Sequence, residues 1–143
     1  DNRIDRTPPK GVNDEGDIAG VWFHGMRVVV ECKATRRASY SAHWGETLVE
    51  MGHAATPLGV VFWKRPGIGL KLRSSMARHL AYMDNDTYRR FRDLLPPDAR
   101  ASLAGMLKTV PRHKDDMTGM TVATFARILN SWQPLGPEGS DSE

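Results

Sequence analysis

The sequence predicts an α/β fold, with a small mixed β-sheet flanked by helices. Segments rich in β-branched and apolar residues alternate with turns that contain glycine or proline, which is typical of strands. Residues 40–55 instead repeat apolar side chains at helical spacing. The continuous apolar run 59–64 is typical of a strand that is buried on both faces. Together these patterns favour a mixed sheet with helices on its faces.

The N-terminal part is predicted to be an irregular lead-in followed by a β-hairpin. Residues 1–16 are polar and rich in Asp, Pro and Gly, which favours irregular structure. The first strand is expected at residues 17–23 and the second at residues 27–34, where three consecutive valines occur. His24-Gly25 supplies a tight turn between them.

A helix over residues 40–55 and the strand 59–64 are expected next. Ser39 or Ser41 is the expected N-cap, and Pro57 ends the helix. The apolar positions that define this helix are Trp44, Leu48, Met51 and Ala55. The core or its edge is the expected place of three tryptophans: Trp22, Trp44 and Trp63.

The C-terminal half is predicted to be mainly helical. Residues 74–109 are expected to form two or three helical pieces, one of them capped by Asn85 or Asp86. Another helix, starting at Pro96-Pro97, is expected to contain Leu103, Met106 and Leu107. Residues 117–120 are expected to form a short strand, and Thr121 or its neighbour to cap a last helix. The apolar side chains expected to face inward are Tyr88, Phe91, Leu94, Leu95, Val122, Phe125, Ile128 and Leu129.

Composition excludes several classes of protein. The length of 143 residues suits one domain, placed at residues 1–133 with a disordered tail at 134–143. No apolar run has the length of a membrane span, and nothing at the start resembles a signal peptide. The single cysteine, Cys32, excludes an internal disulfide, so we expect a cytoplasmic protein. The five histidines lack the spacing of a zinc site.

Positive charge gathers in several short clusters along a chain whose net charge is +3. Arg36 with Arg37, and Lys64 with Arg65, follow the ends of two predicted strands. Phosphate contacts at these places would release counterions from a nucleic acid, so a polyanionic partner is one interpretation. Ordinary solubilising charge is the other, and the sequence does not separate them.

Three residues of the predicted hairpin suit the chemistry of phosphodiester hydrolysis. Glu31 and Lys33 point to the same face of their strand, because side chains alternate along it. Asp17 on the neighbouring strand would bring a second carboxylate to the same end. Two carboxylates hold a hard cation such as Mg²⁺ or Mn²⁺, and the Cys32 carbonyl would add a third oxygen. Lysine would orient or deprotonate the attacking water, or stabilise charge on the phosphate.

The spacing of Asp17 and Glu31-x-Lys33 resembles the PD-(D/E)xK nuclease superfamily. More narrowly, residues 11–20 with 30–33 are similar to Holliday-junction-resolvase-like nucleases of actinobacterial phages, as are residues 59–65 and 120–126. The resemblance implies a restriction-endonuclease-like core. The stretch from 70 to 115 is longer than this core predicts, which indicates a helical insertion at about residues 74–110. The resemblance also implies that Asp17 and Glu31 bind metal and that Lys33 is the catalytic lysine.

The resemblance further implies a DNA substrate, with branched DNA such as a Holliday junction favoured, in a bacterial or phage-infected cell. Two matched cuts at a junction would require a homodimer. The chain departs from the family pattern in two ways: Gly16 stands where Pro is usual, and residues 1–16 leave no room for the helix that usually opens this fold.

Other interpretations of the same residues stay open at this point. Glu31 and Lys33 would also form an ordinary surface pair, which stabilises a fold little. Asp14 and Glu15 are expected to form a turn, with extra metal ligands as the alternative. Glu46 and Glu50 are expected to face solvent on their helix, with a catalytic role as the alternative. The competing functions are a non-catalytic nucleic-acid-binding module and a structural subunit of a larger complex.

Overall fold

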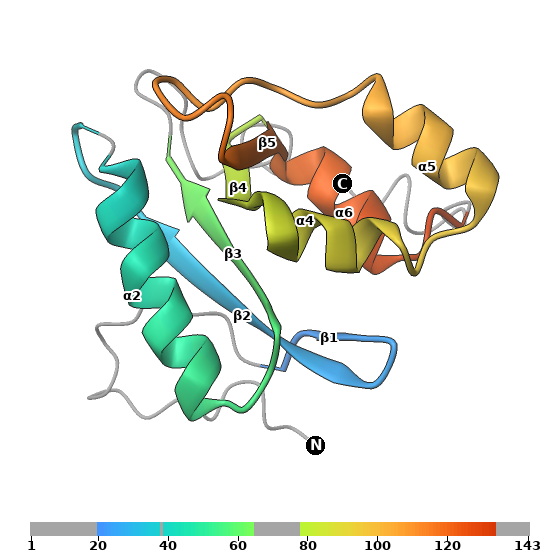
Figure 1. Cartoon of the computed structure of the whole chain (residues 1–143), viewed down its shortest axis with the longest axis horizontal. Helices are drawn as coiled ribbons and strands as arrows, with labels where there is room; N and C mark the ends of the chain where they lie inside the picture. Colours follow the sequence, from blue (N-terminus) through green and yellow to red (C-terminus); the bar gives the residue numbers. More distant parts are fainter. Residues whose placement is uncertain (1–19, 38, 65–77, 134–143) are drawn as a thin grey trace.

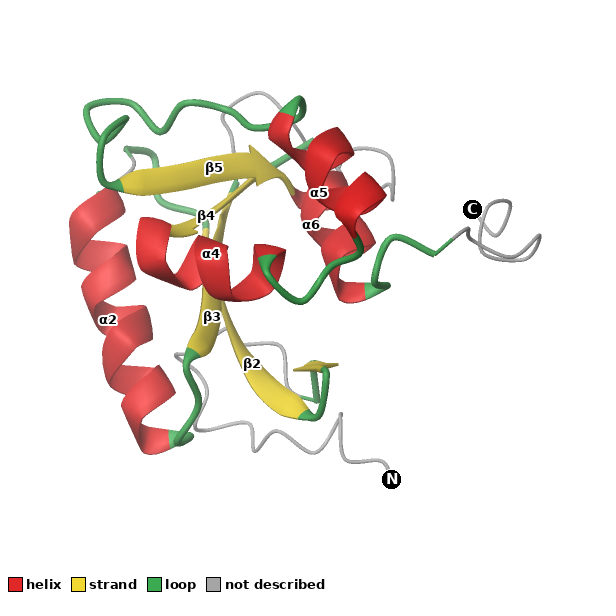
Figure 2. Cartoon of the chain, turned by 45° about the vertical axis from the view of Figure 1, so that its right-hand side comes forward, coloured by secondary structure: helices red, strands yellow, loops and turns green. Residues whose placement is uncertain are grey.

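A computed structural model describes residues 20–37, 39–64 and 78–133 (Figure 1). Within these ranges five strands form one mixed sheet in the order β1-β2-β3-β4-β5, and four helices pack around it. Helix α2 covers one face of the sheet, while α4, α5 and α6 lie on the other side (Figure 2). The elements are β1 Trp22–Phe23, β2 Met26–Lys33, α2 Tyr40–His53, β3 Leu58–Trp63, β4 Leu80–Asp84, α4 Asn85–Arg92, α5 Pro97–Ala104, β5 Met117–Thr121 and α6 Val122–Leu129. The predicted α/β class is confirmed.

The hairpin of β1 and β2 forms around the predicted turn. His24 and Gly25 both have positive φ, of 51° and 80°, as in the type I′ turns that match the twist of paired strands. Phe23 pairs with Met26 in antiparallel register, and the Val28 amide donates to the Val21 carbonyl at 2.8 Å. Residues 17–19 of the predicted first strand lie outside the described residues.

Strands β2 and β3 run parallel, and α2 makes the crossover between them. The helix confirms the predicted segment but ends at His53, so Ala55 lies beyond it with a φ of 54°. Trp44 and Met51 are buried as expected, whereas Leu48 is 44% exposed. The helix packs close to β3 because Gly59 has no side chain there: a Cβ would lie 2.5 Å from Met51 Sδ.

Strand β4 corrects the prediction of a largely helical segment over residues 74–109. Residues 80–84 pair with β3 on one side and with β5 on the other. A short apolar run buried on both faces has the same pattern as a buried helical turn, and Leu80, Ala81 and Met83 favour helices. Pairing with both β3 and β5, which are distant in sequence, makes residues 80–84 a strand. The helical prediction for these five residues is therefore wrong.

The helices after β4 agree with the sequence patterns except at their boundaries. Asp84, rather than Asn85 or Asp86, caps α4, and its carboxylate accepts from the Thr87 amide at 2.8 Å. Thr121 caps α6 as predicted, through the Thr124 amide at 3.1 Å. The expected inward residues that are buried are Tyr88, Phe91, Leu95, Phe125 and Ile128; Val122 and Leu129 are half-buried, and Leu94 is exposed. Leu103 lies in α5 as predicted, whereas Met106 and Leu107 lie beyond its end at Ala104.

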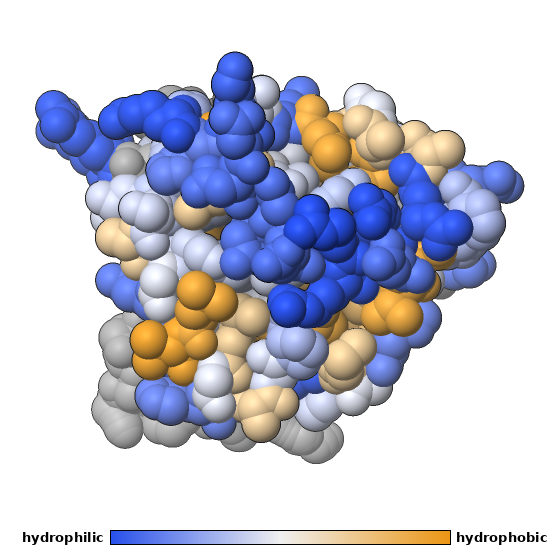
Figure 3. All heavy atoms as spheres, viewed as in Figure 1, coloured by the Kyte–Doolittle hydropathy of each residue, from blue (hydrophilic) through white to orange (hydrophobic). Residues whose placement is uncertain are grey.

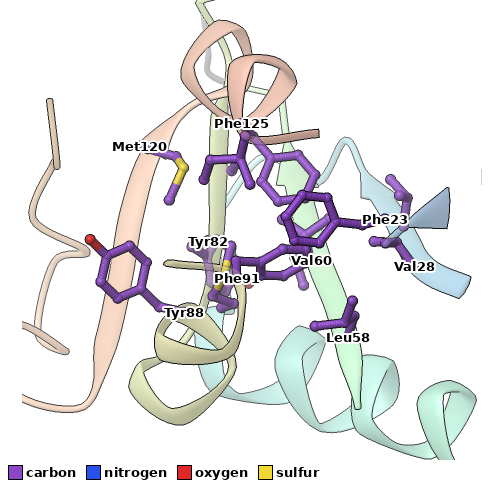
Figure 4. Close-up of a cluster of buried hydrophobic side chains, with 14 of the residues drawn as sticks. Phe23, Val28, Leu58, Val60, Tyr82, Tyr88, Phe91, Met120 and Phe125 are labelled. Carbon is purple, nitrogen blue, oxygen red and sulfur yellow. The ribbon is translucent and has the colours of Figure 1, made fainter. Parts of the chain in front are cut away.

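The main core lies between the sheet and the α4–α6 side. Phe91 joins its parts: its ring centroid is 5.5 Å from that of Phe23 and 5.2 Å from that of Phe125 (Figure 4). Leu58 and Val60 of β3 point into the same cluster (Figure 4). Side chains from both ends of the described chain therefore meet in one core.

The surface is uneven in polarity. Figure 3 shows a strongly hydrophilic area over α4, where Arg89 and Arg90 are exposed. Arg89 forms an ion pair with Asp86, which offsets part of this charge. Trp22 is 59% exposed, so the prediction that it belongs to the core or its edge is wrong. Among the described residues, no helix is long and apolar enough to cross a membrane.

Candidate active site at the end of strand β2

Glu31 and Lys33 lie on the face of β2 that α2 covers. The two side chains point the same way because they are two residues apart on a strand. Lys33 pairs with Glu46 of α2, which fixes the direction of this face. Val28, on the alternate face, points into the core on the opposite side (Figure 4). The predicted convergence of Glu31 and Lys33 on one face is thus present in the structure.

The Lys33 ammonium stands between two carboxylates. Its Nζ atom is 3.3 Å from Glu31 Oε2 and 2.7 Å from Glu46 Oε1. The side chain of Glu31 is 6% exposed, that of Lys33 21% and that of Glu46 55%. The cluster therefore runs from an interior carboxylate on the strand to a surface carboxylate on the helix. Glu31 is therefore not exposed, as an ordinary surface pair with Lys33 would require.

Lys33 is protonated in this arrangement. The hydrogen bond to Glu46 raises the pKa of Lys33 most, and the charge of Glu31 raises it further, against the lowering effect of burial. An ammonium donates hydrogen bonds and has no lone pair to accept a proton. In this state Lys33 can orient a water or stabilise anionic oxygen, whereas removal of a proton from water would require it to lose its own.

His43 is a buried, neutral neighbour of this cluster. Burial lowers the pKa of His43 most, and the nearby Lys33 charge lowers it further. Its Nε2 atom lies 3.5 Å from Thr35 Oγ1, and its Nδ1 atom has no hydrogen-bond partner within the described part of the chain. Neutral His43 adds no positive charge beside Lys33.

The loop after β2 is fixed to the neighbouring strand. The Trp63 indole donates to the Thr35 carbonyl at 3.1 Å, and the Lys64 amide donates to the Lys33 carbonyl at 2.8 Å. Arg36 and Arg37 are exposed in this loop, and Lys64 is half-buried. These three predicted phosphate contacts therefore surround the end of β2. Arg65, the fourth, lies outside the described residues.

The carbonyl and the thiol of Cys32 point in different directions. The Lys33 carbonyl accepts from the Lys64 amide, directly after β3, so strand alternation turns the Cys32 carbonyl toward the opposite edge of β2. The Cys32 side chain lines an apolar pocket with Phe62 and Val122, on the face away from Glu31. The expected core-facing thiol is confirmed.

The structure describes only part of the predicted metal-binding set. Asp17 lies outside the described residues. Within the described ranges, no group of three or more His, Cys, Asp or Glu residues is arranged to hold a metal ion. Glu31 nevertheless supplies the hard oxygen donor that Mg²⁺ prefers. The chemistry of this carboxylate fits such an ion.

Glu46 is exposed, as its helical spacing predicted, but the sequence did not predict its contact with Lys33. A catalytic role for Glu46 is only the second interpretation of its place near the predicted site. The missing signal was topological: α2 begins soon after β2 ends and crosses back to the parallel strand β3. The first turns of a crossover helix lie near the end of the preceding strand. A carboxylate there is placed to meet Lys33.

Comparisons with protein-family models, with curated proteins and with solved structures found no match to the chain. The geometry and the sequence pattern therefore carry the functional interpretation.

Proposed function

We propose that the protein is a divalent-metal-dependent nuclease that hydrolyses DNA phosphodiester bonds, built on a restriction-endonuclease-like core. The observation that carries this proposal is the nearly buried Glu31 carboxylate, paired with the Lys33 ammonium on one strand face. Buried charges are costly, and positions that hold them are frequently functional. A paired acid and lysine beside a loop with Arg36 and Arg37 suits the cutting of a polyanion.

Each residue has a defined role in this proposal. Glu31, Asp17 and the Cys32 carbonyl would hold Mg²⁺ or Mn²⁺, which would supply Lewis acidity toward the phosphate and favour deprotonation of the attacking water. Lys33, as an ammonium, donates to the phosphate oxygens and stabilises the charge that develops there.

Contacts outside the reacting centre position the substrate. Arg36 and Arg37, with Lys64 and Arg65, bind backbone phosphates beside the scissile bond. The resemblance to phage resolvase-like nucleases favours a branched substrate, for which two copies of the chain would make two matched cuts. The sequence pattern alone supports this finer assignment.

Cleavage assays test the proposal. Labelled linear duplex, single-stranded and four-way-junction DNA are incubated with Mg²⁺, Mn²⁺ or EDTA. We expect metal-dependent cutting that falls by about 100-fold or more in Glu31→Gln and Lys33→Ala, because each removes a group that acts on the transition state. Asp17→Asn tests the proposed second ligand in the same way. Glu50→Gln, a substitution on α2 outside the cluster, should cut like the wild type.

Two results would contradict the nuclease. Equal cutting by wild type and Glu31→Gln would assign the activity to another site or to a contaminant. A folded protein that binds DNA in every metal condition without cutting it would instead identify a non-catalytic nucleic-acid-binding module.

A further inference from the structure

The two carboxylates around Lys33 differ in their exposure to solvent and in their distance from the ammonium. Glu31 lies on β2 with its side chain 6% exposed, and Glu46 lies on α2 with its side chain 55% exposed. The Lys33 ammonium is closer to Glu46, at 2.7 Å, than to Glu31, at 3.3 Å. The surface carboxylate therefore makes the shorter of the two contacts.

The proposed metal site creates a conflict at Glu31. A divalent cation and the Lys33 ammonium would both contact this carboxylate, and two cations near one another repel. Repulsion is strong where water is largely excluded, as it is around Glu31. An ammonium with Glu31 as its sole anchor would either keep the ion away or leave the site. A second anchor resolves the conflict.

We propose that Glu46 is a positioning residue that keeps Lys33 in the active site while Glu31 binds the divalent cation. This inference rests on the proposed nuclease function. Glu46 acts through Lys33, with no contact to the ion or the phosphate assigned to it. When the ion takes Glu31, the ammonium keeps its partner on α2 and stays beside the substrate.

The backbone that carries Glu46 is well anchored. The Trp44 indole donates to Asp84 Oδ2 at 3.1 Å, and the Tyr82 hydroxyl donates to the Tyr40 carbonyl at 3.1 Å. Both bonds join the part of α2 just before Glu46 to β4. His43, one turn earlier, is neutral because burial lowers its pKa, so it does not compete with Lys33 for Glu46.

A double-mutant cycle on metal binding tests this role without using cleavage. Mn²⁺ binding is measured by titration for wild type, Glu46→Gln, Lys33→Gln and the double variant. We expect Glu46→Gln to weaken binding by about three- to fivefold, the range of a partly exposed ion pair. Without its second anchor, Lys33 competes with the ion for Glu31. In the Lys33→Gln background, Glu46→Gln should leave Mn²⁺ binding unchanged, since the competing ammonium is gone.

Controls separate the alternative explanations. Glu50→Gln removes the same charge one helical turn further along α2 and should bind Mn²⁺ like the wild type. Equal weakening by Glu46→Gln with and without Lys33 would overturn the inference, because Glu46 would then act on the ion directly. No weakening in a wild-type background that binds Mn²⁺ would overturn it as well. A wild-type protein that binds no Mn²⁺ would overturn the proposed function, and this inference with it.

Discussion

At the scale of single residues, His43 beside Lys33 makes the stability of the fold depend on pH. His43 is buried with its Nδ1 atom unpaired within the described part of the chain, and burial lowers the pKa of its ring. An unfolded chain would protonate this ring near its ordinary pKa of about 6.5. As pH falls below that value, the unfolded state takes up a proton that the folded state does not, so stability falls. The decrease stops below the folded pKa, where both states are protonated.

His43→Leu should remove this pH dependence. We expect the variant to be at least as stable as the wild type at pH 7.5, because an unpaired buried polar atom costs about 1–3 kcal/mol. Between pH 7.5 and 5.5 it should lose less unfolding free energy than the wild type. Urea denaturation at both pH values measures the two losses, and groups common to both proteins cancel in the comparison. Equal losses would show that His43 titrates alike in the folded and unfolded states.

At the scale of elements, Asp84 joins three parts of the fold. It ends β4, caps α4 through the Thr87 amide at 2.8 Å and accepts from the Trp44 indole of α2 at 3.1 Å. Asp84→Ala should cost about 2–4 kcal/mol, since it removes a helix cap and leaves a buried indole N–H unpaired. Thermal and urea unfolding measure the loss.

Ser39→Ala is the matched control for this prediction. Ser39 occupies the N-cap position of α2 but its side chain makes no capping hydrogen bond. Its replacement should change the unfolding free energy by less than about 0.5 kcal/mol. If Asp84→Ala costs no more than Ser39→Ala, the joint between α2, β4 and α4 does not stabilise the fold.

The elements also show how far local sequence patterns determine this structure. Strand β2 and the turn at His24-Gly25 follow from β-branched density and turn chemistry, which act over a few residues. Strand β4 does not, because Leu80–Asp84 becomes a strand through its pairing with β3 and β5. The same holds at the site: strand alternation predicts that Glu31 and Lys33 share a face, while Glu46 joins them through the path of α2. Long-range pairing and crossover geometry are absent from local patterns.

At the scale of the whole molecule, the sheet connects the α2 layer on one face with the α4–α6 layer on the other. Alternate residues of β3 face opposite sides. Leu58 and Val60 pack in the main core (Figure 4), and Gly59 contacts Met51 of α2. Loss of α2 would expose the apolar face of β2 and β3 to water. Each layer therefore depends on the sheet that the other layer supports.

We expect this mutual dependence to make unfolding a single cooperative transition. Trp44 is buried on the α2 side and reports that layer once the other tryptophans, Trp22, Trp63 and Trp132, are replaced by Phe. Its fluorescence and the far-UV circular dichroism should then give the same urea midpoint, as in two-state domains of this size. The wild-type dichroism curve controls for the effect of the replacements themselves. A fluorescence midpoint well below the dichroism midpoint would mean that α2 separates first. The site would then lose Glu46 while β2, with Glu31 and Lys33, stayed folded.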